Sequence, residues 1–327
     1  TNRNMVANMQ QASTWISSIM VEGKETIITA LPLYHIFSLT ANCLTFMKYG
    51  ALVYLITNPR DMKNFVKELK AVKFTAITGV NTLFNGLLNT PGFKDIDFSN
   101  LKLTLGGGLA VQRAVAEHWK NVTGVPLLEA YGLTETSPAA CINPLNLKDY
   151  NGKIGLPISS TECSIQEDDW NHLPIGEIGE LCIRGPQVMK GYWQRPKETS
   201  DVLSNDGWLH TGDIGFMDED GFVQIVDRKK DMILVSGFNV YPNEVEGIIA
   251  HHPDVVEVGV IGVPDEKSGE AVVAVVIRSK PSLTEEALID YCRENLTGYK
   301  RPRHVFFTEE LPKTNVGKIL RRELRAK

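Results

Sequence analysis

Two short stretches of the sequence combine residue types that could hold a ribose. Asp213 lies in Thr211–Gly215, where two glycines let the backbone come close to a ligand. A carboxylate in such a turn can accept hydrogen bonds from both hydroxyls of a vicinal diol. Arg228, in the charged run Asp227–Asp231, can supply planar, charge-assisted donors to the same ligand. An acidic turn and a solvated charge run are the simpler explanations of each stretch taken alone.

A second candidate region contains three consecutive glycines. The run Leu101–Leu105 predicts a strand, and it leads into Gly106, Gly107 and Gly108 before a helical pattern begins. Three glycines allow backbone groups to lie flat against a planar ring. In open parallel sheets, ligands bind outside the carboxyl ends of the strands, where these glycines fall. A tight strand-to-helix turn is the alternative for such a run.

The predicted strand Leu127–Ala130 runs into a loop with several polar side chains. Tyr131, which precedes Gly132, can stack on a base, and Thr134 offers a hydroxyl to a phosphate or acyl oxygen. Glu135 offers a carboxylate to Mg²⁺, which commonly takes one or two protein carboxylates and completes its shell with phosphates and water. A Ser/Thr-rich loop with a solvent-facing glutamate is the alternative.

A lysine near the C-terminus and a histidine near the N-terminus are further candidates. Lys318 follows a glycine at a loop-to-helix boundary, where its flexible ammonium suits a phosphate or the charge of a transition state. A basic helix start explains Lys318 equally well. His35 precedes a helix predicted over Phe37–Lys48 and has no Ser/Asp partner pattern, so we expect it at the wall or gate of an apolar pocket. The residues expected to line that pocket are His35, Phe37, Asn81 and Phe84.

The elements that would position these residues fall into four segments, and the predicted fold class is α/β. Residues 1–137 alternate β-rich and helical runs, which indicates an incomplete parallel-sheet domain with helices on both faces. Residues 138–226 carry Gly and Pro between short apolar runs, which predicts a β-rich, barrel-like subdomain. The charges of 227–231 indicate a linker rather than a core segment. Residues 232–327 predict a small α+β domain, in which Thr284 caps a helix.

Composition narrows the class of protein. The chain has 327 residues, of which 43% are hydrophobic and 22% charged, so two or three domains with a substantial core are expected. A net charge of -5 argues against bulk nucleic-acid binding. The basic tail, residues 300–327, suits a polyanionic small ligand, and a solvated helix face is the alternative. Five cysteines without a CxxC pair disfavour a disulfide framework and a zinc site, and they fit a reducing cytoplasm.

Several of these motifs resemble those of the adenylate-forming superfamily, which comprises acyl-CoA synthetases, luciferases and peptide-synthetase adenylation domains. The stretch from Asp206 to Asp231 looks like the fatty acyl-CoA synthetase signature. The resemblance covers essentially the whole chain, as the C-terminal portion of such an enzyme, and it is closest to the bacterial long-chain fatty acyl-CoA synthetases. Further similar motifs are Ile77–Phe84, Pro186–Met189, Gly191–Pro196, Ser236–Asn243 and Leu296–Tyr299.

The resemblance implies a two-step ligase reaction that uses ATP, Mg²⁺ and coenzyme A. A medium- or long-chain fatty acid first forms an acyl-adenylate, and the thiol of coenzyme A then displaces AMP. The small C-terminal domain of such enzymes rotates between the two steps. Matched by position, the implied roles are adenine binding for Gly106–Gly108, Tyr131 and Gly132, contact with the α-phosphate region for Thr134, Mg²⁺ binding for Glu135, ribose binding for Asp213 and Arg228, and adenylation for Lys318. Lys230 matches the hinge position, and Gly237 lies in a loop that would line the pantetheine tunnel.

One motif of the superfamily is absent from the sequence. The Ser/Thr/Gly-rich phosphate loop that ends in Lys-Gly lies, in relatives, just upstream of the segment that Thr1–Asn4 resembles. The sequence also has no initiator Met, so we expect a piece of a longer protein. By itself, this piece should adenylate fatty acids weakly or not at all.

Other functions and partners stay open from the sequence. A ligase for aryl or short-chain acids would share the nucleotide motifs. A non-catalytic, synthetase-like binding protein would explain the absent phosphate loop, although Glu135, Asp213, Arg228 and Lys318 together favour an enzyme. The expected compartment is the cytoplasm. Peripheral contact of the basic tail with the inner face of the membrane, and a homodimer, are left open.

Overall fold

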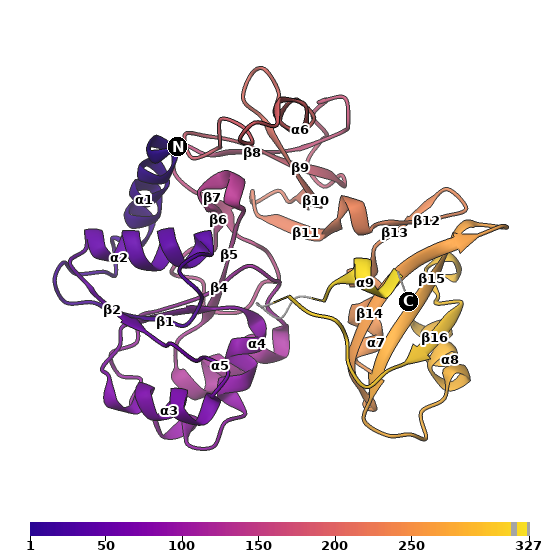
Figure 1. Ribbon diagram of the computed structural model, residues 1–327, viewed down its shortest axis with the longest axis horizontal. Helices are drawn as coiled ribbons and strands as arrows, with labels where there is room; N and C mark the ends of the chain where they lie inside the picture. Colours follow the sequence, from indigo (N-terminus) through magenta and orange to yellow (C-terminus); the bar gives the residue numbers. More distant parts are fainter. Residues whose placement is uncertain (315–318, 326–327) are drawn as a thin grey trace. The chain divides into compact units, whose positions relative to one another are not determined.

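The computed structural model describes residues 1–314 and 319–325. The chain divides into two compact units, Thr1–Thr211 with Phe216–Ile225, and Gly212–Gly215 with Val226–Lys327. Each unit has its own hydrophobic core, and Figure 1 labels the helices and strands. No helix within the described ranges is long and apolar enough to cross a membrane.

A seven-stranded sheet forms the centre of the first unit. Its strand order is β2-β1-β3-β4-β5-β6-β7, in which β1 to β5 run parallel, β6 pairs antiparallel with β5, and β7 pairs antiparallel with β6. The parallel part follows from the helices that connect successive strands. Both antiparallel strands come from the segment 138–226, so this segment contributes to two sheets. The strands are β1 (Thr26–Thr29), β2 (Leu52–Leu55), β3 (Ala76–Gly79), β4 (Leu103–Gly106), β5 (Leu127–Gly132), β6 (Ala139–Ile142) and β7 (Leu156–Pro157).

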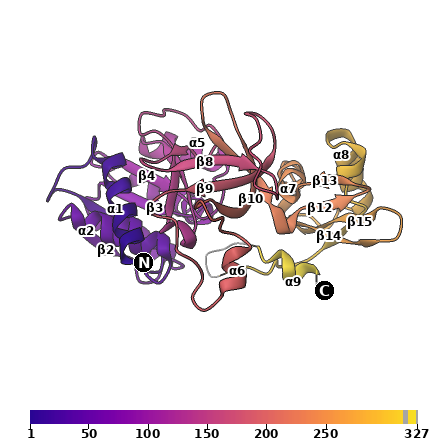
Figure 2. The same ribbon diagram turned by 90° about the horizontal axis from the view of Figure 1, so that it is seen from above.

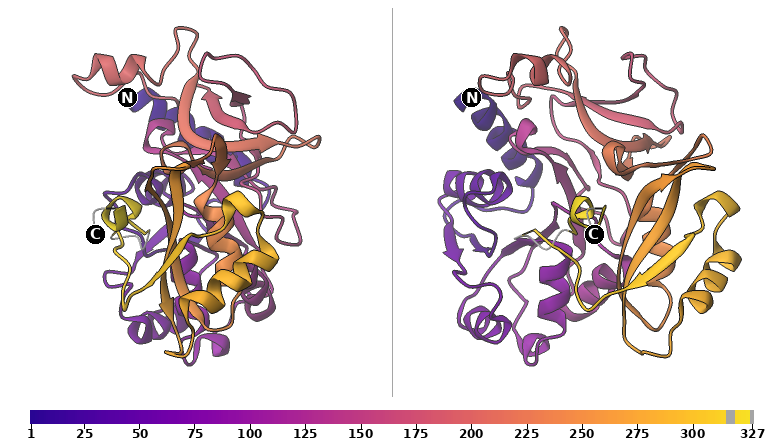
Figure 3. Two further views of the ribbon diagram at one scale, coloured as in Figure 1. Left: turned by 90° about the vertical axis from the view of Figure 1, so that its right-hand side faces the viewer. Right: turned by 45° about the vertical axis from the view of Figure 1, so that its right-hand side comes forward.

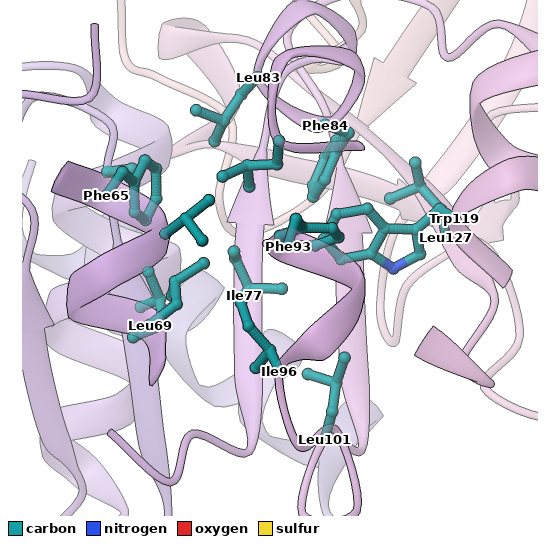
Figure 4. Packing of buried hydrophobic residues seen from close by; sticks show 14 of the residues in the cluster. Phe65, Leu69, Ile77, Leu83, Phe84, Phe93, Ile96, Leu101, Trp119 and Leu127 are labelled. Atoms are coloured by element: carbon teal, nitrogen blue, oxygen red, sulfur yellow. The ribbon is translucent and has the colours of Figure 1, made fainter. Parts of the chain in front are cut away.

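Large apolar side chains pack the helices onto this sheet. Figure 4 shows Phe65 and Leu69 facing the strand that carries Ile77. The rings of Phe84 and Trp119 meet edge to face with centroids 4.8 Å apart, and both side chains are fully buried. The helices are α1 (Asn2–Ile16), α2 (Thr45–Lys48), α3 (Met62–Ala71), α4 (Asn81–Leu88) and α5 (Arg113–Thr123), with 3-10 turns at Phe93–Asp95 and Thr134–Thr136.

The helix predicted over Phe37–Lys48 is not a single α-helix. A π-helix covers Phe37–Leu44, and α2 follows it. The Asn42 amide is buried and donates to Thr29 Oγ1 over 3.3 Å, while Thr78 Oγ1 donates to Asn42 Oδ1 over 2.9 Å. Polar side chains therefore hold this segment to β1 and β3. π-helical turns occur frequently at functional sites, which makes the segment of interest for ligand binding.

A four-stranded sheet forms most of the segment 138–226. Its strand path runs linearly in the order β11-β10-β9-β8, and β8 and β9 are antiparallel. Figure 2 shows β8, β9 and β10 side by side. Leu181 and Ile183 of β9 are fully buried in the cluster beneath it. The elements are β8 (Glu162–Gln166), β9 (Gly179–Arg184), α6 (Pro196–Ser200), β10 (Leu209–Met217) and β11 (Val223–Arg228).

The second unit contains a five-stranded sheet in the order β13-β12-β15-β14, with β16 parallel to β15. Its two longest strands, β14 and β15, are drawn in orange in Figure 3. Val260 and Val272 face the cluster of α7 and α8, whereas Ile261 and Val273 face Leu311 and Leu324, because successive side chains alternate between faces. The elements are β12 (Ile233–Val235), β13 (Phe238–Val240), α7 (Pro242–Ala250), β14 (Val255–Asp265), β15 (Gly269–Arg278), α8 (Glu285–Asn295), β16 (His304–Phe307) and α9 (Arg321–Arg325), with 3-10 turns at Lys229–Asp231 and Gly298–Lys300.

In this unit the predicted helix cap at Thr284 is confirmed, whereas the predicted solvation of the charged run 227–231 is not. Thr284 caps α8 as predicted, because its side chain accepts from the Ala287 amide over 3.2 Å. The expectation that the charged run 227–231 is solvated throughout is wrong for its two aspartates. Asp227 is 0% exposed and Asp231 is 7% exposed. The buried guanidinium of Arg321 lies 3.3 Å from one and 3.2 Å from the other, which compensates their charge.

Candidate functional site

The three glycines form a close-packed corner at the carboxyl end of β4. Gly106 is the last residue of the strand, and Gly108 has a φ of +76°, which favours glycine. A Cβ on Gly107 would lie 3.0 Å from the Ala130 carbonyl oxygen and 3.1 Å from the Phe37 ring. The absence of side chains here leaves bare backbone beside the π-helix. The structure thus brings Phe37 and the triple glycine together.

Two side chains from neighbouring elements hold the chain that follows the glycines. Glu129 Oε1 accepts from the Val111 amide over 3.0 Å, and Asn81 Oδ1 accepts from the Gln112 amide over 2.9 Å. Burial raises the pKa of Glu129 to about 7, although the hydrogen bond from the Val111 amide lowers it. Asn81 therefore anchors the glycine corner. Glu129 was not foreseen, although a charged residue in an apolar strand is a signal that could have found it.

The loop after β5 has a backbone that only glycine permits at Gly132. A Cβ there would lie 2.0 Å from the Pro138 carbonyl oxygen, which also accepts from the Leu133 amide over 3.1 Å. This fold-back presents Thr134 exposed and Glu135 half-buried on a 3-10 turn. Tyr131 is half-buried at the end of β5. The three side chains predicted to meet a nucleotide therefore project from one short stretch.

The Glu135 carboxylate has a partner that the sequence reasoning missed. The Tyr192 hydroxyl donates to Glu135 Oε1 over 2.8 Å, and the Met189 amide donates to the Glu135 carbonyl over 2.8 Å. Burial and the hydrogen bond to the carboxylate raise the pKa of Tyr192 to about 12, so the phenol keeps its proton at physiological pH. The motif Gly191–Pro196, which contains this tyrosine, resembles the adenylate-forming superfamily, but the sequence alone predicts no role for Tyr192.

The predicted ribose pair is formed in the second unit. Arg228 Nε lies 3.3 Å from Asp213 Oδ1, and the Asp213 side chain is 7% exposed. The predicted turn at Thr211–Gly215 is wrong, because Gly212 and Asp213 lie within strand β10; Gly212 has a φ of +74°, which favours glycine. Lys230 and Gly237 are both exposed, the first in the 3-10 turn after β11 and the second between β12 and β13 with a φ of +84°. Lys318 lies outside the described residues.

The pocket-wall candidates differ in burial. His35 and Phe37 are half-buried at the start of the π-helix, where the His35 Nδ1 accepts from the Phe37 amide over 3.3 Å. Phe84 is fully buried in the main core cluster against Trp119. Phe84 therefore contributes to the packing of the core.

The chemistry available to these groups can be read from their types. Bare backbone at Gly107 suits a planar ring, and the Asp213–Arg228 pair suits a diol. No cluster of three metal-binding side chains exists among residues 1–314 and 319–325. One half-exposed carboxylate beside the Thr134 hydroxyl nevertheless fits Mg²⁺ that arrives with a phosphate ligand, because such an ion needs only one or two protein carboxylates.

Comparison with known proteins identifies the family to which the chain belongs. The model for the AMP-binding enzyme family matches residues 1–193, and the model for the AMP-binding enzyme C-terminal domain matches residues 244–318. The chain belongs to the AMP-binding enzyme family. The predicted superfamily and the α/β fold class are both confirmed.

Curated relatives and a solved structure of this family match nearly the whole chain. The long-chain-fatty-acid–CoA ligases of Yersinia pestis and Escherichia coli O6:H1 are 60% and 58% identical to it over 325 residues, which are 99% of the chain and 58% of either relative. The chain thus spans little more than half the length of these relatives. ATP-bound MatB from Rhodopseudomonas palustris is 30% identical with a TM-score of 0.90, over 100% of the chain and 64% of MatB.

Proposed function

We propose that the full-length gene product activates medium- or long-chain fatty acids to acyl-CoA. In the first step the fatty carboxylate attacks the α-phosphorus of ATP, which forms an acyl-adenylate and releases pyrophosphate. In the second step the thiol of coenzyme A attacks the acyl carbonyl, the proton of the thiol is lost, and AMP leaves. The observation that carries the proposal is identity of 58–60% over 99% of the chain to proteins named long-chain-fatty-acid–CoA ligase.

Two separate groups of residues would bind the adenine and the ribose of the nucleotide. Adenine would lie against Gly106–Gly108, Tyr131 and Gly132, because bare backbone and an aromatic face suit a planar base. The Asp213 carboxylate would accept from the ribose hydroxyls, and the Arg228 guanidinium would hold the diol from its other side. The close approach of backbone at Gly107 and the 3.3 Å contact of the pair support this assignment.

The phosphates of ATP would be contacted by the loop after β5 and by the C-terminal lysine. Thr134 would donate its hydroxyl to the α-phosphate region, and Glu135 would hold Mg²⁺, which shields phosphate charge when bound. Lys318 would neutralise the negative charge that develops during adenylate formation, because a flexible ammonium acts as a point charge. The half-exposed carboxylate of Glu135, held by Tyr192, supports its part.

The four segments of the chain would have different roles in binding and in the motion between the two steps. Residues 1–137 would bind acyl chain and adenylate together with the β-rich subdomain 138–226, and residues 232–327 would form the mobile domain. The linker 227–231 would be the hinge, with Lys230 as its pivot and Gly237 in the loop that meets pantetheine. The division of the chain into two compact units near Val226 supports a hinge at this place.

The acid would bind beside Phe37, His35 and the glycine corner. Aryl and short-chain acids are the alternative substrates, because the nucleotide motifs do not distinguish them. The full-length gene product should release pyrophosphate with oleate, ATP and Mg²⁺, and turn over palmitate with coenzyme A faster than octanoate or 4-coumarate. Preference for 4-coumarate would replace the fatty-acid assignment, and an absence of turnover with every acid would point to a non-catalytic binding protein.

The same protein would work in the cytoplasm. Five free cysteines within the described residues fit a reducing compartment. The basic tail would contact coenzyme A, and its contact with an anionic membrane is tested by flotation with phosphatidylglycerol vesicles. Sedimentation of the pure protein decides between a monomer and a homodimer.

A further inference from the structure

A nearly buried arginine in the second unit binds four side chains at once. Arg321 opens α9, and its side chain is 10% exposed. Its guanidinium donates to Asp227 Oδ1 over 3.3 Å and to Asp231 Oδ2 over 3.2 Å. It also makes a bidentate pair with Glu246 of α7, over 3.1 and 2.8 Å, and donates to Asn243 Oδ1. None of these four contacts of the Arg321 guanidinium involves a side chain of the proposed ribose pair.

The acceptors of this guanidinium are themselves fixed. Asp227 accepts from the Arg228 and Asn243 amides, each over 2.6 Å, and Glu246 accepts from the Val260 amide over 2.8 Å. Burial raises the pKa of Asp227 and of Glu246, and the nearby Arg321 charge acts against that rise. The network therefore has carboxylates held in place and one nearly buried cation, Arg321, that reaches all three of them, while Arg325 lies 3.6 Å from Asp231 alone. Removal of the cation would leave buried charge unpaired.

The chain on both sides of residues 315–318 is held on the same unit. The Leu320 amide donates to the Pro312 carbonyl over 2.8 Å, and Lys313 and Ile319 form an antiparallel bridge. Leu311 and Leu324 are buried on the second face of the sheet. These contacts are local or apolar, and Lys313 Nζ in addition pairs with Glu257 Oε1 of β14 over 2.7 Å. Arg321 adds a directional, charged attachment to the linker residues Asp227 and Asp231, 94 and 90 positions earlier in the chain.

We propose that Arg321 is a positioning residue that docks the C-terminal residues 311–314 and 319–325 onto Asp227, Asp231 and Glu246. Lys318 precedes this arginine by three positions in the chain, so loss of the docking should impair the step that Lys318 serves. The inference rests on the proposed role of Lys318 in adenylate formation. A planar fork with five donors is needed for four partners, so lysine, which keeps the charge, cannot replace it.

The docking itself is tested without any reaction. Hydrogen exchange is measured by mass spectrometry on the full-length gene product for peptides that cover 311–325, in Arg321→Lys and in the matched control Arg322→Lys, whose arginine is exposed. Exchange in these peptides should speed up about tenfold or more in Arg321→Lys and stay at the wild-type rate in Arg322→Lys. Equal exchange in the two variants would overturn the docking.

The link to the chemistry is tested by a double-mutant cycle. Arg321→Lys should slow pyrophosphate release with oleate about tenfold, and slow thioester formation from supplied oleoyl-adenylate less than about threefold. In a Lys318→Ala background, the same substitution should change pyrophosphate release less than about twofold, because the lysine it positions is gone. Losses that multiply fully would overturn a role through Lys318. A wild-type protein without pyrophosphate release would instead refute the proposed function, and hydrogen exchange would still decide the docking.

Discussion

At the scale of single residues, the Glu135 carboxylate shows how one side chain depends on another far along the chain. Tyr192 lies 57 positions later and donates to one carboxylate oxygen over 2.8 Å. A hydrogen bond of this kind fixes the rotation of a carboxylate and so the direction in which its other oxygen points. Partners of metal ligands commonly affect metal affinity by about tenfold or more. Tyr192 is therefore expected to matter for Mg²⁺ without touching the substrate.

Tyr192→Phe should raise the Mg²⁺ concentration for half-maximal pyrophosphate release about tenfold, with a smaller change of kcat at saturating Mg²⁺. The phenylalanine keeps the ring and removes only the donor. Mg²⁺ titrations at fixed ATP and oleate measure this shift. Trp193→Phe is the control, because its indole is 87% exposed. An equal shift in both variants, or none in Tyr192→Phe, would contradict the role of the hydroxyl.

Glu129 should make the first unit less stable at alkaline pH. Its pKa in the folded chain is about 7, above the ordinary value of 4.5, so the fold disfavours the ionised form. The stability contribution of the neutral carboxyl is complete below pH 4.5 and is lost as the pH rises through 7. Glu129→Gln keeps the acceptor for the Val111 amide and cannot ionise. The unfolding free energy of this variant relative to wild type should therefore be up to about 3 kcal/mol higher at pH 8 than at pH 5.

Urea unfolding at the two pH values measures this gain. Glu117→Gln is the matched control, because its side chain on α5 is 57% exposed. If the two variants depend on pH in the same way, the Glu129 carboxyl is not the titrating group.

At the scale of elements, α1 differs from helices that can be predicted from the periodicity of their apolar residues. Its buried residues include Asn4, Asn8 and Gln11, so it has no continuous apolar stripe. Asn8 Nδ2 donates to the Ala139 carbonyl over 2.7 Å, and the Ala139 amide donates to Asn8 Oδ1 over 3.0 Å. The side chain thus pairs with β6 as a neighbouring strand would. The helix is held by hydrogen bonds to strand backbone rather than by apolar packing alone.

Asn8→Ala should cost about 1–3 kcal/mol of unfolding free energy, because it leaves a buried amide and a buried carbonyl of Ala139 without this partner. Asn2→Ala, at an exposed position of the same helix, should cost much less. Thermal and urea unfolding compare the two. Equal losses would show that the helix does not depend on this contact.

These elements show how far the sequence could predict the structure. The apolar periodicity of a helix such as α3 makes it predictable, because its buried face differs in residue type from the exposed one. A helix was predicted over Phe37–Lys48 but its π-helical form was not, and α1 was not predicted, because the buried faces of both carry polar groups whose partners lie on other strands. The Asp213–Arg228 contact followed from a shared motif. Tyr192 and Arg321 did not, because their contacts depend on residues 57 to 94 positions away, and no local spacing encodes such distances.

At the scale of the whole molecule, the linker has less freedom than its composition indicates. Asp227 and Asp231 are both bonded to Arg321, so the exposed Lys230 lies between two anchored positions. Because both positions are held by the same guanidinium, rotation about Lys230 requires at least one of these contacts to open.

Lys230→Pro should slow thioester formation from supplied oleoyl-adenylate about tenfold or more and change adenylate formation less than about threefold. Proline fixes φ near one value, which suits at most one of two linker conformations. Lys230→Ala removes the side chain without this restriction and should retain both half-reactions. Single-turnover assays separate the steps. Equal slowing of both half-reactions in Lys230→Pro would place the pivot elsewhere.

The carboxylates around Arg321 also bear on the order in which the second unit can form. Asp227, Asp231 and Glu246 come early in this unit, and the cation that compensates them comes 75 to 94 positions later. During synthesis, the acidic residues emerge long before their partner. This site can therefore be buried only after residue 321 has been synthesised, and until then the linker is hydrated and accessible to proteases. Closure of the network by Arg321 would be a late step of folding, one that a nascent chain stalled before residue 321 cannot complete.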